Sequence, residues 1–417
     1  MSAEVLTDKQ VFSRTQSSKY LIIAFLIWPF FAFLVALGNL KNRVNLGIIY
    51  LFFILYGFTF VINPAMDGQR YASNLKAAYY NSSGISLLTS LYDENGAVDL
   101  LEPTLVFLVS RFTAQHNVLF ALFACIFGYF YLKSIKLVHH QYAEKRNNNA
   151  LIFFLFFPWI VPIFEINGFR FWTASWMFFF AAYKVVFEEN RRFILLAVAV
   201  CFVHFSFAPV VLLLMLYQLL GNHRTIYFTA SILTLFVSEL DLQFMREIAA
   251  SFDGSLSVKA NRYLHEQYIE LVSDLDRSAA WFMKLYTPLL FYFVLGQLIF
   301  VYAKMKQVNV SKSFSNLFSF TCLILSFSNI STLVPSGARF RSVYMIFAIA
   351  LLVYFYSHVY VKPKLKWFVV AGVAPFLLKI LISTRVGADT MNTVWFMPGP
   401  IISFMYDMPF PVKEWLF

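Results

Sequence analysis

The chain has 417 residues, of which 60% are hydrophobic, 20% are aromatic and only 13% are charged, a composition that excludes an ordinary soluble domain. A net charge of +11 would suggest nucleic-acid binding in a soluble protein, but here the Lys and Arg residues concentrate in short loops between apolar runs. That distribution is typical of the cytoplasmic loops of membrane proteins. We therefore predict an all-α polytopic membrane protein that resides in a lipid bilayer and does not bind nucleic acid.

Apolar runs recur along the whole chain, so we treat residues 1–417 as a single integral membrane domain. The runs cover residues 20–38, 44–62, 117–138, 150–164, 169–187, 193–220, 225–240, 281–303, 314–333, 339–360 and 366–384. The run 193–220 is long for one span, and we expect Pro209 to break it near His204 into two shorter helices. This gives about 12 membrane segments.

Basic residues after the run 117–138 predict a cytoplasmic loop, and the other sides follow by alternation. The broken helix at His204 keeps the later lysine-rich loops cytoplasmic. Three regions are then extracytoplasmic: the loop 63–116, the loop 241–280 and the C-terminal tail 385–417. Within 241–280, apolar residues recur at helical spacing and predict an amphipathic surface helix, namely Leu264, Tyr268, Leu271 and Leu275.

A polar segment, Glu165-Ile166-Asn167-Gly168-Phe169-Arg170, interrupts two long apolar runs on the same outer side. A permanently charged guanidinium at the start of a membrane helix is costly and requires a partner, for which we favour an anionic substrate. Asn167 and Gly168 would shape the turn that opens the helix.

The predicted topology brings six polar residues from separate parts of the chain to the outer end of the bundle: Asp67, Arg70, Arg170, His204, Arg339 and Arg341. Each arginine taken alone could be an interfacial anchor, His204 could be a hydrogen-bonded core residue, and Asp67 could be a helix cap. Together they suit the binding of a diphosphate, and the imidazole suits a general base. Arg341, which shares a helix face with Tyr344, is a stronger candidate than Arg339.

The sequence contains no carboxylate or histidine cluster with metal-ligand spacing and no phosphate-binding glycine loop. We therefore expect neither a metal nor another cofactor.

Several short motifs, in their order along the chain, resemble the EpsG branch of the Wzy-type O-antigen, capsule and exopolysaccharide polymerases. They are Asp67 with Tyr71, Glu102-Pro103, Asn167-Gly168-Phe169-Arg170, His204-Phe205-Ser206 and Arg341-Ser342-Val343-Tyr344. One departure is Phe171, where the family often has glutamine. The resemblance implies a glycosyltransferase of the bacterial cytoplasmic membrane, with a GT-C-like architecture similar to that of the O-antigen ligases.

The resemblance further implies that oligosaccharide repeat units on undecaprenyl diphosphate are joined at the outer membrane face. His204, or alternatively Asp67, would be the base. Four arginines would bind the diphosphate, with five supporting residues: Arg170, Arg341, Arg339 and Arg70, then Asn167, Tyr71, Ser206, Tyr344 and Glu102. Chain-length regulators and other polysaccharide-assembly proteins are the candidate protein partners. Two alternatives stay open: a transporter or flippase of an anionic lipid-linked sugar, and a ligase-type glycan transferase.

Overall fold

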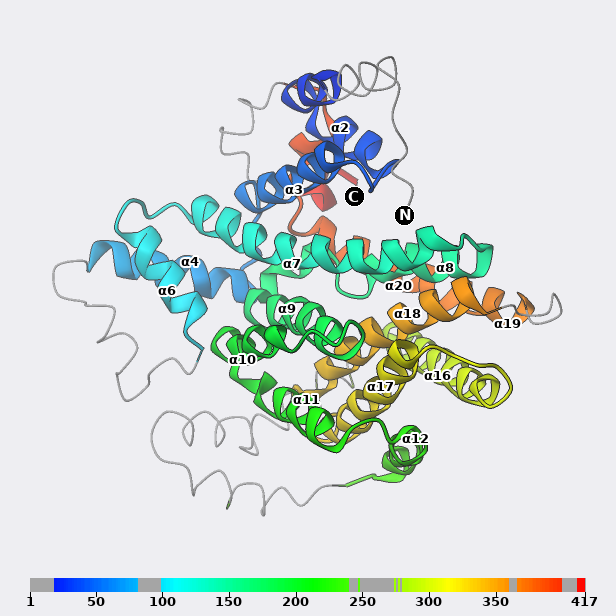
Figure 1. The fold of residues 1–417 in the computed structure, drawn as a ribbon. Coiled ribbons are helices and arrows are strands. Elements are labelled where there is room, and N and C mark those ends of the chain that lie inside the picture. Colours follow the sequence, from blue (N-terminus) through cyan, green and yellow to red (C-terminus); the bar gives the residue numbers. More distant parts are fainter. Residues whose placement is uncertain are drawn as a thin grey trace.

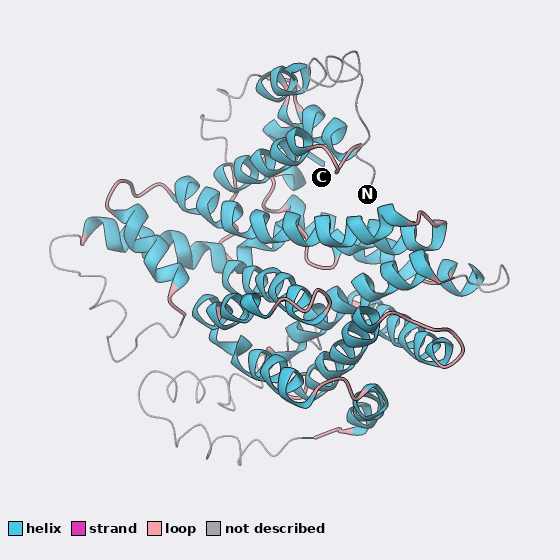
Figure 2. Cartoon of the chain, viewed as in Figure 1, coloured by secondary structure: helices cyan, strands magenta, loops and turns pink. Residues whose placement is uncertain are grey.

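The structure is a computed structural model that describes residues 19–81, 99–239, 280–359, 366–399 and 411–416, together with residues 247, 274 and 277. Within these residues the regular secondary structure is helical (Figure 2), and the one recorded β-bridge, Asn392 to Pro411, is isolated. The all-α prediction is confirmed for this part of the chain. The expected amphipathic helix, with Leu264, Tyr268, Leu271 and Leu275, lies outside the described residues.

In the described ranges, six helical stretches are long and apolar enough to cross a membrane: His116–Glu144, Asn148–Val186, Lys284–Met305, Lys312–Ser331, Gly337–His358 and Trp367–Ala388. Shorter apolar helices accompany them at Arg43–Phe58, Leu101–Ser110 and Phe205–Leu220. The chain is thus a multi-pass membrane protein by the length and composition of its helices. The predicted count of about 12 segments is not confirmed, because several predicted runs consist of shorter helices.

Helices α2 (Pro29–Leu37) and α3 (Arg43–Phe58) form a hairpin. They pack together, and the Asn42 side chain caps α3 by accepting from the Val44 N–H at 2.8 Å. The C-terminal region returns to this hairpin. In η8 (Thr393–Phe396), the Trp395 indole donates to Thr59 at 2.8 Å, and the short α21 (Val412–Leu416) follows. These contacts anchor the described part of the tail to the end of α3.

Helix α7 (His116–Glu144) crosses the middle of the molecule, with α2 and α3 on one side (Figure 1). On its other side lie α9 (Phe169–Val186), α10 (Ile194–Val203), α17 (Lys312–Ser331) and α18 (Phe340–His358). Aromatic stacking fixes both sides. Phe120 stacks on Phe60 with ring centroids 4.4 Å apart, and Phe123 stacks on Phe169 at 3.9 Å. Phenylalanine rings therefore form much of the packed interior around the polar residues.

The predicted span 150–164 is not one helix. Helix α8 (Asn148–Phe156) ends early and is followed by two 3₁₀ segments, η1 (Phe157–Trp159) and η2 (Ile163–Gly168). Pro158 and Pro162 lack the N–H that a continuing helix needs, which explains the early end. The next helix, α9 (Phe169–Val186), agrees closely with its predicted range. The polar segment therefore begins in η2 and ends in the first turn of α9, where Phe169 and Arg170 lie.

The helix break at His204 is confirmed. Helix α10 (Ile194–Val203), preceded by η3 (Arg191–Phe193), ends at His204, whose φ of −151° and ψ of 113° are extended. The chain then continues through η4 (Phe205–Phe207) into α11 (Ala208–Leu220). At about 1.5 Å per residue, α10 and α11 measure only ~15 and ~20 Å, too short to cross a ~30 Å hydrocarbon core.

The two helices form a hairpin, because Arg191 before α10 and Gly221 after α11 line the same pocket. His204 is therefore at its apex. The remaining bundle consists of α12 (Arg224–Leu233) with η5 (Thr234–Phe236), α16 (Trp281–Met305), α17 (Lys312–Ser331), η6 (Gly337–Arg339) with α18 (Phe340–His358), α19 (Lys366–Val370) and α20 (Val373–Ala388).

Two ends of this bundle can be defined. The Arg170 end comprises the starts of α9 and α18, the apex at His204, and the helices α4 (Asp67–Tyr80) and α6 (Leu101–Ser110), which project at the left of Figure 1. The Lys312 end comprises the end of α9, the base of the α10–α11 hairpin and the start of α17. Helix α9 connects them over ~27 Å.

Candidate functional site

Arg170, at the start of α9, forms an ion pair within the chain. Its Nη1 donates to Asp99 Oδ2 at 2.8 Å, with the two side chains only 20% and 6% exposed. The guanidinium thus has the partner that its burial requires, and that partner is a carboxylate of the protein. Nε of Arg170 is buried and has no hydrogen-bond partner among the described residues, so the group keeps donor capacity.

Asp99 also holds the apex of the helical hairpin. Its second oxygen, Oδ1, accepts the Phe205 N–H at 2.8 Å, and the next residue, Leu100, donates its N–H to the Phe202 carbonyl at 2.8 Å. The carboxylate therefore connects Arg170 to the start of η4, where helix N–H groups lack intrahelical partners. This fixes the helix break at the level of Arg170.

The polar segment is tied to α4 through Asn167. Its Oδ1 accepts the Gly68 N–H at 2.9 Å, and a Cβ on Gly68 would stand 2.8 Å from that oxygen. Next to Gly68, Asp67 pairs with Arg70 at 3.3 Å, with both side chains about half exposed. A side chain at position 68 would displace this oxygen, and Asn167 has a clear structural contact.

Two further predicted residues line the interior side of this cluster. Tyr71 is 1% exposed, and the Arg70 guanidinium lies 5.3 Å from its ring centroid, while Arg170 opposes the rise in the Tyr71 pKa that burial causes. Glu102, at the first turn of α6, is 7% exposed; burial raises its pKa, and the nearby Arg170 and Arg70 charges oppose that rise. Five predicted residues and Asp99 thus form one connected group: Asp67, Arg70, Tyr71, Asp99, Glu102 and Arg170.

His204 adjoins this group through Phe171. The imidazole meets the Phe171 ring edge-on, with centroids 5.4 Å apart, and the Arg339 guanidinium lies 5.9 Å from the same ring. Phe171, at which the sequence departs from the family pattern, therefore lies between His204 and Arg339 and contacts both. Arg339 is exposed and belongs to η6, just before α18.

The hydrogen bonds of His204 define its tautomer. Nδ1 accepts the Ser206 N–H at 3.3 Å and lies 2.9 Å from the Ser206 hydroxyl. A backbone N–H can only donate, so Nδ1 carries the lone pair and the neutral ring has its proton on Nε2. Ser206, a predicted supporting residue, thereby orients the ring.

Arg341 and Tyr344 turn toward a different helix. The Arg341 guanidinium lies 4.7 Å from the Phe291 ring of α16, and Tyr344 packs edge-on against the same ring at 6.0 Å. The ring contacts of Arg341 and Tyr344 thus lie on the α16 side. Arg339 and Arg341 are two positions apart and face different neighbours, Phe171 and Phe291.

Asp99 is not among the residues that the sequence predicts for this site. The available signal was the requirement for a counter-charge to Arg170, combined with the apolar residues that flank Asp99-Leu100-Leu101-Glu102. No group of His, Cys, Asp and Glu residues in the described ranges is arranged to hold a metal ion.

A family model, the EpsG family, matches residues 44–396. The chain belongs to the EpsG family. The match covers every element of the site described above, from α4 to α18, and the predicted membership is confirmed. EpsG membership indicates a polysaccharide polymerase-type function for this membrane protein. No curated protein and no solved structure matches the chain.

Proposed function

We propose that the protein is a polysaccharide polymerase that joins undecaprenyl-diphosphate-linked oligosaccharide repeat units at the outer face of the bacterial cytoplasmic membrane. The observation that carries the proposal is the gathering of charged residues at the Arg170 end in a member of the EpsG family. The basic loops cluster at the opposite end of α9, which supports an outward orientation for the Arg170 end by the positive-inside rule.

In the proposed reaction, a hydroxyl of one repeat unit attacks the anomeric carbon of the growing glycan. The new carbon–oxygen bond forms while the bond to the diphosphate oxygen breaks, and a base takes the hydroxyl proton. The lipid diphosphate leaves with its added negative charge. Fixed cations near the leaving oxygen would lower the barrier most effectively in a water-poor site.

The diphosphate would lie between the Phe171 side and the α4 side of the site. Arg339 and Arg70 have exposed guanidinium groups, so they are accessible to an incoming anion. Arg170 would contribute its Nε–H, which has no hydrogen-bond partner among the described residues, while its Nη1 is engaged by Asp99. Arg341 would contact the lipid-bearing part of the substrate from the α16 side.

The base would be His204 or Asp67, and their surroundings differ. Asp67 is 43% exposed and can accept a proton directly. His204 holds its proton on Nε2, so acting as a base through that nitrogen requires the proton to move first, while donating to a diphosphate oxygen does not. The geometry therefore favours His204 as a hydrogen-bond donor and Asp67 as the base.

The test measures polymer length and lipid-linked repeat units in cells that express single variants. We expect His204→Ala, Arg170→Ala and Asp67→Asn to insert normally, to make no polymer and to accumulate the unpolymerised unit. Arg192→Gln, an exposed change at the Lys312 end, is the matched control and should make normal polymer. Wild-type polymer in both His204→Ala and Arg170→Ala would contradict this site.

Two conservative variants separate the roles. His204→Gln keeps a side-chain N–H donor but cannot take up a proton at neutral pH, so retained polymer indicates donation and complete loss indicates a base. Arg170→Lys keeps the charge but not the planar fork, so a bidentate role predicts loss. Chain extension by purified protein in detergent distinguishes an enzyme from a transporter, and the acceptor that is extended distinguishes a polymerase from a ligase.

A further inference from the structure

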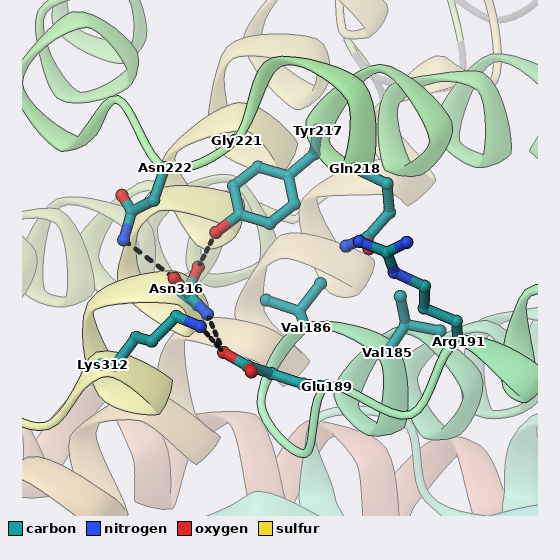
Figure 3. A pocket seen from close by; sticks show the side chains of 10 residues that line it. All are labelled: Val185, Val186, Glu189, Arg191, Tyr217, Gln218, Gly221, Asn222, Lys312 and Asn316. Atoms are coloured by element: carbon teal, nitrogen blue, oxygen red, sulfur yellow. Dashed lines mark hydrogen bonds and ion pairs between the residues drawn. The ribbon is translucent and has the colours of Figure 1, made fainter.

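A second polar site lies at the Lys312 end, at the far end of α9 from Arg170. It is a pocket of about 290 Å³, formed where the end of α9, the base of the α10–α11 hairpin and the start of α17 meet (Figure 3). The lining comprises Val185, Val186, Glu189, Arg191, Tyr217, Gln218, Gly221, Asn222, Lys312 and Asn316. Its volume is at the lower end of ligand sites, enough for a headgroup or a single sugar.

One wall of the pocket is held rigidly by hydrogen bonds between helices. Glu189 Oε1 accepts from Lys312 Nζ at 2.7 Å and from the Asn316 amide at 3.2 Å, and Asn222 donates to Asn316 Oδ1 at 2.9 Å. Glu189 has a φ of 55°, a left-handed conformation that is unfavourable for a residue with a side chain. The bonds from Lys312 and Asn316 hold the Glu189 side chain against α17, so this wall is formed without a ligand.

The opposite wall presents unused polar groups. Arg191 and Gln218 extend toward each other beside Val185 (Figure 3), and neither side chain has a hydrogen bond or close ion pair among the residues that are described. The lining contains two cations, Arg191 and Lys312, and one carboxylate, Glu189, so its net charge is +1. Glu189 is already bound by Lys312, which leaves Arg191 available for an anion.

The rim beside Arg191 and Gln218 is apolar and exposed. Leu195, one turn after Arg191, is 79% exposed, and Leu219, next to Gln218, is 82% exposed. Leu212 and Leu216 extend the stripe along α11 at i, i+4 and i+7 spacing with Leu219. A free cation and an amide at the end of such a stripe match an amphipathic ligand, with a charged head in the pocket and hydrocarbon along α11.

We propose that this pocket binds a phosphate group, carried on the headgroup of an anionic phospholipid, between Arg191 and Gln218. The Arg191 guanidinium forms charge-assisted hydrogen bonds with the phosphate oxygens, and the Gln218 amide donates a further one. The acyl chains lie against Leu219, Leu216 and Leu212. This site is separate from the proposed polymerase site, and it would anchor the Lys312 end of α9 at the membrane surface.

The experiment uses native mass spectrometry of the full-length protein in detergent, with phosphatidylglycerol and phosphatidylcholine of identical acyl chains as probes. We expect wild-type protein to retain phosphatidylglycerol preferentially. Arg191→Gln should weaken its binding roughly tenfold, as for the loss of one charge-assisted contact. Gln218→Glu, which places a carboxylate beside the phosphate, should weaken it as well.

Arg192→Gln is the matched control, because Arg192 is the adjacent exposed arginine and does not line the pocket. It should leave phosphatidylglycerol binding unchanged. Phosphatidylcholine carries the same phosphate next to a choline cation that Arg191 repels, so it should bind more weakly than phosphatidylglycerol and lose less on Arg191→Gln. Equal losses in Arg191→Gln and Arg192→Gln, or no loss in either, would overturn the proposal. Thermal stabilisation by inorganic phosphate that requires Arg191, without preference for phosphatidylglycerol, would overturn the lipid source and support a soluble phosphate ligand.

Discussion

Each end of α9 is tied to a neighbouring segment by one carboxylate–cation pair, and the two pairs are nearly equal in length. The Asp99–Arg170 pair measures 2.8 Å and the Glu189–Lys312 pair 2.7 Å, but the side chains are 6% and 20% exposed in the first and 49% and 77% exposed in the second. An exposed pair contributes little, whereas breaking a buried pair leaves an uncompensated charge at low dielectric. The two ion pairs therefore differ in burial and not in length, and we expect the buried pair to contribute more to stability.

The two carboxylates, Asp99 and Glu189, also have different structural roles. At the Arg170 end, Asp99 joins the Arg170 side chain at the start of α9 to the Phe205 backbone N–H at the apex of the α10–α11 hairpin, so the carboxylate sets the relative position of Arg170 and His204. At the Lys312 end, Glu189 joins side chains of one helix, α17, and leaves Arg191 uncommitted. The first pair organises a site, and the second forms one wall of a pocket.

The largest expected effect comes from Asp99→Asn. The amide still can accept the Phe205 N–H, but Arg170 loses its counter-charge, which should destabilise the protein by about 3 kcal/mol. Lys312→Gln at the other end should cost at most about 1 kcal/mol. Thermal unfolding in detergent, followed by circular dichroism, measures both.

A double variant provides the control for this prediction. Asp99→Asn combined with Arg170→Gln removes both charges, so its loss of stability should be smaller than the sum of the two single losses. If Asp99→Asn and Lys312→Gln prove equally mild, the ranking of the two ends by burial is wrong.

A smaller effect is expected at Gly68, where an added Cβ would crowd the Asn167 oxygen at 2.8 Å. Gly68→Ala should displace the hydrogen bond that holds η2 against α4 and cost about 1–2 kcal/mol. Gly47→Ala is the matched control, because Gly47 is an exposed helical glycine with nothing within 4 Å of the added Cβ, and it should stabilise by up to about 1 kcal/mol. Equal effects of both changes on the unfolding temperature would show that Gly68 has no special constraint.

The sequence predicted the long helices well, because their apolar runs are continuous and end at charged residues. The range 169–187 agrees with α9, and the break at His204 follows from Pro209 and from the positions of later lysines. The prediction of one helix over 150–164 was wrong because two prolines, Pro158 and Pro162, interrupt this apolar run after α8. Hydropathy alone does not distinguish a helix from a series of 3₁₀ turns.

The candidate site was predictable in its residues but not in its pairings. The charge of Arg170 implied a partner. Asp99, however, lies 71 positions away in the sequence, and nothing local distinguishes it from the other acidic residues of the loop. Arg339 and Arg341 are two positions apart, and only packing shows that one faces Phe171 and the other Phe291. Such choices depend on tertiary contacts that a single sequence does not encode locally.

The smallest expected effects concern pH, and they should have opposite signs at the two ends. Burial raises the pKa of Glu102, so its contribution to stability is full below the unfolded-state pKa of about 4.3 and is lost as the pH rises through the folded-state value. The hydrogen bond from Lys312 lowers the pKa of Glu189, so its contribution is full above about 4.3 and is lost as the pH falls through the folded-state value. The unfolding temperature of the wild type minus that of Glu102→Gln should therefore decrease as the pH rises from about 4. The corresponding difference for Glu189→Gln should decrease as the pH falls below about 4. The same sign for both variants would mean that burial at the Arg170 end does not dominate the ionisation of its carboxylates.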